Sequence, residues 1–233
     1  VQKFPDRWNP PTDLSYHIGR KPASSKSQKV HPVTDQEIID LIDSLENDER
    51  AKRDIPAALN WARAIKLMVT FGLRPEELKH LEKKIDPKTK KEYLWCSYQK
   101  RAGGGMTDAR RLYPLYPVNE KGVKQDWNLV ELFDQKDFLL PSLQNKNGVG
   151  EACLKYLKRQ KCWKQLIKNV EKRNERAGSY SFRHSYSVRG HLLDIDNGSM
   201  SLAMGHSIET HCREYPWATK SATTNAFKIA LAA

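Results

Sequence analysis

The chain has 233 residues, of which 40 are Lys or Arg and 28 are Asp or Glu, so its net charge at pH 7 is +12 and its pI is near 9.5. This length can bury a real hydrophobic core, and the positive charge predicts attraction to a polyanion, because each neutralised phosphate releases condensed counterions. No apolar run approaches the roughly 18 residues needed to span a bilayer, and the amino terminus shows no signal-peptide pattern. We therefore expect a soluble protein located in the cytoplasm, and exclude membrane-spanning and secreted classes.

The first part of the chain is predicted to be an arm followed by helices. Residues 1–30 contain four prolines and a polar run and lack sustained periodicity, which is typical of a linker. The folded unit is expected to span 31–233 and to begin with TDQE (34–37), a capping box that opens a helix. Further helices are predicted over about 56–71 and 75–84.

The middle of the chain changes character. EYLWCSYQ (92–99) and ARRLYPL (109–115) are aromatic-rich and predict two strands, while 100–108, with three consecutive glycines, predicts a flexible hairpin tip. A helical pattern returns from residue 119 onward. The later helices are predicted at about 150–175, 181–193, 199–204, 207–215 and 220–231. We therefore predict a mainly α fold with a small antiparallel β-sheet, of the α+β class.

Two arginines stand in patterns that favour anion binding. FGLRPEEL (71–78) places Arg74 after a glycine at a helix start, where a guanidinium can present its fork to a phosphate. Glu77 lies on the same helical face and can brace it. Arg183 lies in YSFRHSYSVRGHLL (180–193), a helix expected to pack on the core, where an arginine needs a phosphate or a carboxylate as partner.

A third segment, MGHSIETHCREY (204–215), adds an imidazole and a phenol. His206 follows a glycine turn, and Tyr215 comes nine residues later, near the end of a short helix. A lone histidine beside a lone tyrosine is usually structural. Combined with two arginines, however, an imidazole and a phenol are the groups needed for a nucleophilic attack on a phosphodiester that uses no metal ion.

The order and spacing of the three motifs resemble those of the tyrosine recombinases, also called the phage-integrase family, over about residues 34–231. The resemblance implies the catalytic-domain fold of that family. It also implies that Tyr215 is the nucleophile that forms a 3′-phosphotyrosyl link. Arg74 and Arg183 would hold the non-bridging oxygens, and His206 would hydrogen-bond a phosphate oxygen.

One position departs from the family pattern. Three residues before the second arginine the family normally has a histidine, and here Tyr180 stands there. A phenol, with a pKa near 10, can donate to phosphate but is a poor base at neutral pH. His184 supports the site but cannot simply substitute, because one position along a helix turns a side chain by about 100°. In this position the sequence resembles a branch of cyanobacterial developmental excisases that also has tyrosine there, so we interpret Tyr180 as a tolerated variant.

Further basic residues are candidates for DNA contacts. The family uses a hairpin lysine to protonate the leaving 5′-oxygen; Lys100 fits that place, and Arg101 is the alternative. The stretch 151–176 is rich in Lys and Arg on a predicted helix. The candidate DNA-binding residues are Arg101, Lys155, Lys158 and Arg159.

We expect neither a metal nor another cofactor. His206 and His211 are five residues apart and do not share a helical face as i, i+4 metal pairs do. The resemblance implies double-stranded DNA as partner, with helix 220–231 linking copies into a tetramer, in a prokaryotic cytoplasm at the nucleoid. Residues 1–30 are too short for the amino-terminal domain of the family, so the chain is expected to be its catalytic part.

Two alternatives remain open at this point. A type IB topoisomerase uses nearly the same groups for strand transfer, although the MGHS box with tyrosine nine residues on favours a recombinase. The other alternative is a basic DNA-binding module that has lost catalysis. In that case Tyr180, in place of the family's usual histidine, would be the sign of the loss.

Overall fold

The computed structural model describes residues 30–102 and 105–216, and it describes only the backbone of 101, 102, 105 and 106. Within these residues the α-helices are α1 (Asp35–Asn47), α2 (Ile55–Phe71), α3 (Leu129–Leu132), α4 (Val149–Leu157), α5 (Lys161–Lys172), α6 (Ser181–Leu192), α7 (Asn197–Met204) and α8 (Ile208–Glu214). The 3₁₀ helices are η1 (Lys52–Asp54) and η2 (Pro75–His80). The strands are β1 (Leu81–Ile85), β2 (Glu92–Cys96), β3 (Arg101–Ala102), β4 (Gly105–Met106) and β5 (Arg110–Arg111).

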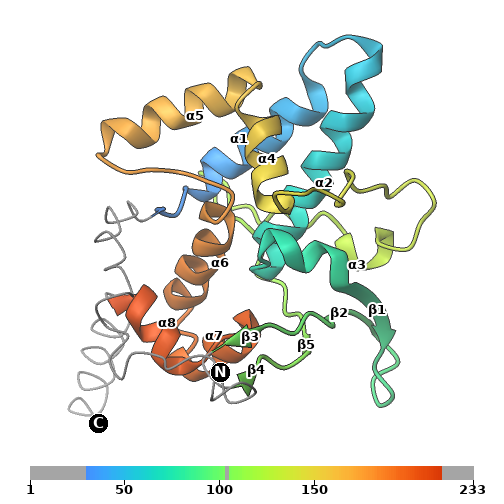
Figure 1. Ribbon diagram of the computed structural model, residues 1–233, viewed down its shortest axis with the longest axis vertical. Coiled ribbons are helices and arrows are strands. Elements are labelled where there is room, and N and C mark those ends of the chain that lie inside the picture. Colours follow the sequence, from blue (N-terminus) through green and yellow to red (C-terminus); the bar gives the residue numbers. More distant parts are fainter. Residues whose placement is uncertain (1–29, 103–104, 217–233) are drawn as a thin grey trace, which may run out of the picture.

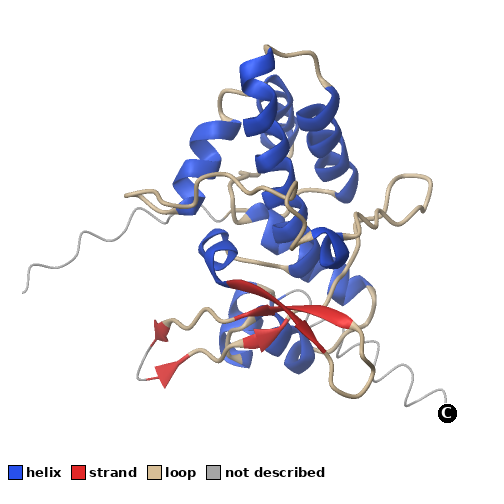
Figure 2. Ribbon diagram, turned by 90° about the vertical axis from the view of Figure 1, so that its right-hand side faces the viewer, coloured by secondary structure: helices blue, strands red, loops and turns tan. Residues whose placement is uncertain are grey.

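Helices α1, α2, α4 and α5 gather at one end of the molecule, and the strands, α7 and α8 lie at the other (Figure 1). Helix α6 runs between the two groups. Strands β1, β2 and β5 form an antiparallel sheet in that order, and β3 pairs with β4 in a separate small hairpin. Figure 2 shows the strands below the larger group of helices. The predicted mainly α fold with a small antiparallel sheet is confirmed.

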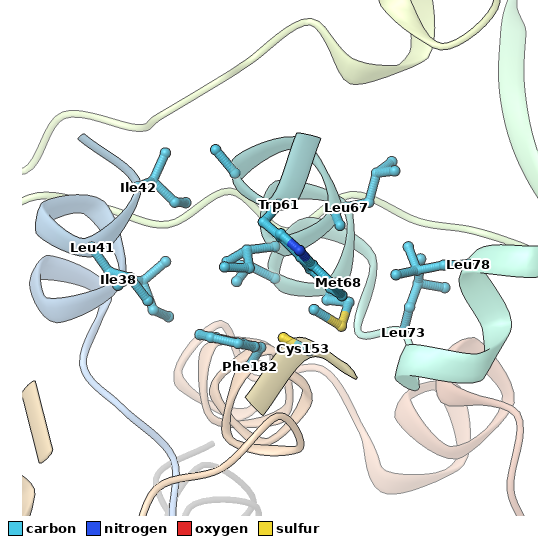
Figure 3. Packing of buried hydrophobic residues seen from close by; sticks show 14 of the residues in the cluster. Ile38, Leu41, Ile42, Trp61, Leu67, Met68, Leu73, Leu78, Cys153 and Phe182 are labelled. Carbon is cyan, nitrogen blue, oxygen red and sulfur yellow. The ribbon is translucent and has the colours of Figure 1, made fainter. Parts of the chain in front are cut away.

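The main core forms where α1, α2 and α6 meet. The predicted capping box at Thr34 and Glu37 is present, and it starts α1 in the register that buries one face. Leu41 of α1, Met68 of α2 and Phe182 of α6 pack in this core (Figure 3). Because α6 is anchored here by burial of its apolar side chains, the polar residues on its other positions are held in fixed places.

The segment after Arg74 differs from the prediction of one helix over 75–84. The 3₁₀ helix η2 ends at His80, and the chain continues directly as β1, which pairs along its length with β2, from Leu81 opposite Cys96 to Ile85 opposite Glu92. Ladder hydrogen bonds with β2 satisfy the backbone that a helix would have used. A third strand in the sheet was therefore missed.

Two helix predictions in the second half need correction. The stretch from residue 119 to α4 is mostly loop apart from α3, and it begins with a turn in which the Asn119 side chain accepts hydrogen bonds from the backbone N–H groups of Lys121 and Val123. The predicted helix 150–175 is interrupted at 158–160, where turn bonds end α4 before α5 begins. Residues 1–29 of the predicted arm 1–30 and the predicted helix 220–231 lie outside the described residues.

Among the helices of the described residues, none has the length and apolar character that a membrane crossing requires.

Candidate active site

Glu77 of η2 is the centre of a cluster of arginines. Its side chain is fully buried, and its Oε1 lies 2.6 Å from Nη1 of Arg74. Arg110 of β5 pairs with both carboxylate oxygens, at 3.2 Å and 2.8 Å. Arg183 of α6 approaches the same carboxylate at 3.7 Å. Two arginines more than a hundred residues apart in the sequence, Arg74 and Arg183, therefore converge on one carboxylate.

Main-chain carbonyl groups hold the guanidinium groups in place. Arg183 donates to the carbonyl oxygens of Gly72 and Met204, each at 2.5 Å. Arg74 donates to the carbonyl oxygen of Gly205 at 3.1 Å. These acceptors come from the end of α2 and the end of α7, so the cluster also fixes how these two helix ends sit relative to α6.

Arg110 was missed by the sequence analysis. It is 8% exposed, and its Nε donates to the carbonyl oxygen of Ala203 at 2.9 Å. A usable signal was present, because alternation along a strand puts Arg110 on the same side as the buried Leu112, and a charged residue on a buried face needs a partner.

Gly205 makes room for Arg110. The glycine ends α7 with a left-handed φ of +64°, and a Cβ added there would lie 2.5 Å from Nη1 of Arg110. A side chain at this position would therefore collide with the guanidinium as well as strain the backbone. The glycine of the MGHS motif is thus explained by a close approach.

The cluster carries more positive than negative charge. Burial by itself raises the pKa of Glu77, but the charges of Arg183 and Arg110 outweigh it, so the pKa of this carboxyl is lowered. Burial, and then the nearby Arg74, lowers the pKa of Arg183 to about 10, which still leaves it charged at neutral pH. Three guanidinium groups facing one carboxylate have an uncompensated positive charge, and this environment favours an anion.

A cleft of about 1340 Å³ opens beside this cluster. Arg74, Arg110, Lys100 and His206 are among the residues that line it. Arg183, which is 3% exposed, does not line the cleft in this conformation. The basic lining gives the cleft the electrostatic character needed to bind a phosphate.

Lys100 reaches this cleft from the segment before β3. Its backbone N–H donates to Oγ1 of Thr107 at 2.9 Å, and its carbonyl oxygen accepts from the N–H of Thr107 at 3.0 Å. This pairing closes the small hairpin on which the lysine was predicted to lie. The side chain of Arg101 is outside the described residues.

His206 stands at the turn between α7 and α8, next to the arginines. Burial, followed by the charges of Arg183, His211 and Arg74, lowers the pKa of His206 to about 2. The imidazole is therefore neutral at pH 7 when no anion is present. Its Nε2 lies 2.8 Å from Nδ1 of His211.

Tyr215 ends α8 and is buried, with 5% of its surface exposed. It packs with Tyr186, Met200 and Met204, and burial raises the pKa of its phenol, against the effect of the nearby Arg183. Its hydroxyl lies 2.7 Å from Nδ1 of His184. His184 is therefore an imidazole within hydrogen-bond distance of the phenol, and the ring of His211 also packs against Tyr215, with ring centroids 4.9 Å apart.

The sequence did not predict this contact between His184 and Tyr215. The one-residue turn of the helix does separate the side chains of positions 183 and 184, but Tyr215 follows α8 onto the side of α6 where His184 lies. Tyr180, in contrast, precedes the first residue of α6, is 45% exposed and does not line the cleft.

The other basic residues predicted to contact DNA lie elsewhere on α4 and the turn after it. Lys155, Lys158 and Arg159 are all exposed, and the lining of the cleft includes none of them. Among the described residues, no group of three or more His, Cys, Asp or Glu side chains is arranged to hold a metal ion.

No protein-family model matches this sequence, and no curated protein matches it. Among solved structures, the chain is similar to the XerH site-specific recombinase bound to difH substrate, with 20% identity over 82% of this chain and 51% of that one and a TM-score of 0.45. It is also similar to the Tn1549 transposon integrase in complex with transposon right end DNA, with 16% identity over 97% of this chain and 73% of that one and a TM-score of 0.48. The chain spans about half the length of the XerH chain. Identities and TM-scores this low do not assign the chain to a family.

Proposed function

We propose that this protein is a site-specific DNA recombinase of the tyrosine recombinase type, which cleaves and rejoins DNA through a covalent 3′-phosphotyrosyl intermediate. The observation that carries the proposal is the convergence of Arg74, Arg110 and Arg183 on a single buried carboxylate, beside a cleft and within electrostatic reach of Tyr215. The sequence motifs of that family are the ones that supply Arg74, Arg183, His206 and Tyr215.

The geometry supports a definite first step. The proton of the Tyr215 phenol passes to Nδ1 of His184, 2.7 Å away, and the phenolate oxygen attacks the scissile phosphorus. The bond between phosphorus and the 5′-oxygen breaks, and that oxygen takes a proton, for which Lys100 is the donor. The guanidinium groups stabilise the charge that develops on the non-bridging oxygens. Because Tyr215 and Arg183 are buried, the step also requires the cleft to open toward them when DNA binds.

The chain described here would act as the catalytic part of such an enzyme, with 1–30 as a linker to further segments. Duplex DNA is the proposed partner, and the proposed tetramer would form through 220–231. No nucleotide cofactor is needed, since the phosphotyrosyl bond conserves the energy of the phosphodiester. No metal is needed either, because the arginines and the lysine take its place in stabilising the charge that develops on the phosphate. The role of Lys155, Lys158 and Arg159 in this proposal is to contact DNA outside the cleft.

The proposal is tested by trapping the covalent intermediate. The protein is incubated with a pool of randomised duplexes that carry a nick, so that the short strand released by cleavage diffuses away and religation fails. We expect a protein–DNA adduct that resists denaturant, and mass spectrometry should map the linked nucleotide to Tyr215. Tyr215→Phe should form no adduct while binding the same duplexes equally well.

Two outcomes would contradict the proposal. Wild-type protein that binds the duplex pool but yields no adduct would favour the DNA-binding module without catalysis. An adduct of equal yield with Tyr215→Phe would exclude Tyr215 as nucleophile. Relaxation of supercoiled plasmid regardless of sequence would instead favour a type IB topoisomerase.

His184→Gln should slow formation of the adduct by about a hundredfold, because glutamine can accept a hydrogen bond from the phenol but cannot take its proton. The measurement is the single-turnover rate on the nicked duplex, and Tyr180→Phe is the matched control, since Tyr180 is 45% exposed. A larger loss with Tyr180→Phe than with His184→Gln would show that the tyrosine, and not His184, assists the nucleophile.

A further inference from the structure

Three histidines from different parts of the fold form a continuous chain next to the arginine cluster. His211 of α8 is fully buried, and its two ring nitrogens face two other imidazoles. Its Nδ1 lies 2.8 Å from Nε2 of His206, and its Nε2 lies 2.9 Å from Nε2 of His191, near the end of α6. Of the three rings, His206 lines the cleft.

All three rings are neutral at pH 7. Burial is the largest cause in each case, and it lowers the pKa of His206 to about 2, that of His211 to about 4, and that of His191 below its ordinary value. A neutral imidazole has one N–H donor and one acceptor nitrogen. His211 must therefore donate on one side and accept on the other, and the three rings share a single direction of donation.

The surroundings of His191, the histidine farthest from the cleft, set that direction. The backbone of Ile195 raises the pKa of His191 against the larger effect of burial, which is the effect expected of a carbonyl oxygen that accepts a hydrogen bond from the ring. Since Nε2 of His191 faces His211, the donor is Nδ1, and Nε2 must accept from His211. His211 then accepts at Nδ1, and His206 donates from Nε2.

We propose that His191 and His211 are positioning residues that hold His206 in one orientation. The Nε2–H of His206 then donates to His211, and Nδ1 is the nitrogen available to an anion bound in the cleft. This inference deepens the proposed function and, as a role in catalysis, rests on it. Nδ1 of the neutral ring and a phosphate oxygen are both acceptors, so contact between them requires a proton on Nδ1. That proton comes from solvent, and the charge of the anion offsets the charge of the imidazolium, whose Nε2–H stays on His211.

The tautomer can be read without DNA, by long-range ¹H–¹⁵N correlation spectra of the 233-residue protein at neutral pH, with the His206 signals assigned from His206→Gln. We expect His206 to show a protonated Nε2 and a bare Nδ1. His211→Phe should remove the acceptor and give averaged signals from both tautomers. His211→Asn, whose side-chain oxygen can replace Nδ1 of His211, should restore the wild-type pattern.

One further variant tests the inference and another serves as a control. His191→Phe leaves the contact between His206 and His211 but removes the anchor at Ile195, so it should also give a mixture of tautomers. His80→Phe, at a histidine that packs against Tyr98, should leave the His206 signals unchanged. A wild-type His206 protonated at Nδ1, or signals that no substitution at 191 or 211 changes, would overturn the inference.

The rate of adduct formation supplies the functional readout. His211→Phe should slow it by about ten- to a hundredfold, by analogy with the outer partners of metal-bound histidines, and His211→Asn should recover most of the loss. If the wild-type protein forms no adduct, the proposed function fails, but the tautomer result still stands. If the tautomer changes while the adduct rate of His211→Phe equals that of wild type, the positioning role is wrong and the recombinase proposal is untouched.

Discussion

Glu77→Gln is expected to lower the free energy of unfolding by about 3–5 kcal/mol, the usual cost of removing one partner from a buried ion pair. The carboxylate has no exposed surface and contacts three guanidinium groups, from the residue before η2, from β5 and from α6. Glutamine keeps the shape but leaves these charges facing one another without a counterion. Urea denaturation at pH 7, followed by circular dichroism, measures the change.

The matched control is Glu92→Gln on β2, whose ion pair with Lys83 at 3.3 Å involves a carboxylate with 44% of its side chain exposed. Its effect should stay within about 0.5 kcal/mol, as expected of a surface pair. If Glu77→Gln costs no more than Glu92→Gln, the carboxylate is not the counterion that holds the arginines together.

The same interaction predicts a dependence on pH. A carboxyl whose pKa in the folded protein lies below its ordinary value of 4.5 stabilises the fold above that value, and this stability is lost as the pH falls through the lowered pKa. The difference in unfolding free energy between wild type and Glu77→Gln should therefore be constant at neutral pH and shrink below about pH 4.5. A difference that grows on acidification would contradict the lowered pKa.

Arg183→Lys is expected to reduce the rate of adduct formation by about a thousandfold or more, in the range seen when an arginine that stabilises phosphoryl-transfer charge is lost. The lysine keeps the positive charge near Glu77 but cannot reproduce the planar fork that donates to the carbonyl oxygens of Gly72 and Met204. Single-turnover cleavage of the nicked duplex, with binding measured separately, gives the loss.

Arg189→Lys distinguishes a chemical role from a structural one. Arg189 lies on the same helix, is similarly buried, and pairs with Asp35 and the carbonyl oxygen of Val69, away from the cleft. Its replacement should lower stability yet leave the adduct rate of the folded protein within a few fold of wild type. Equal losses of rate in both variants would show that Arg183 acts only through the fold.

Local sequence was sufficient for the elements that depend on local chemistry. The capping box at Thr34 and the left-handed Gly72 after α2 set the ends of these helices through neighbouring residues, and both were predictable. Strand β1 was not predictable in this way, because its backbone is satisfied by β2, a separate segment, rather than by its own residues.

The candidate site likewise has residues that the sequence identified and contacts that only the tertiary structure shows. The motifs alone identified Arg74, Glu77, Arg183, His206 and Tyr215 as candidates, because each residue type carries its chemistry wherever it lies. Only the tertiary structure decided that Arg110 joins the arginines and that His184 contacts the hydroxyl of Tyr215. Both contacts connect elements that are distant in sequence, and their geometry depends on how β5 and α8 pack against η2 and α6, which local sequence does not encode.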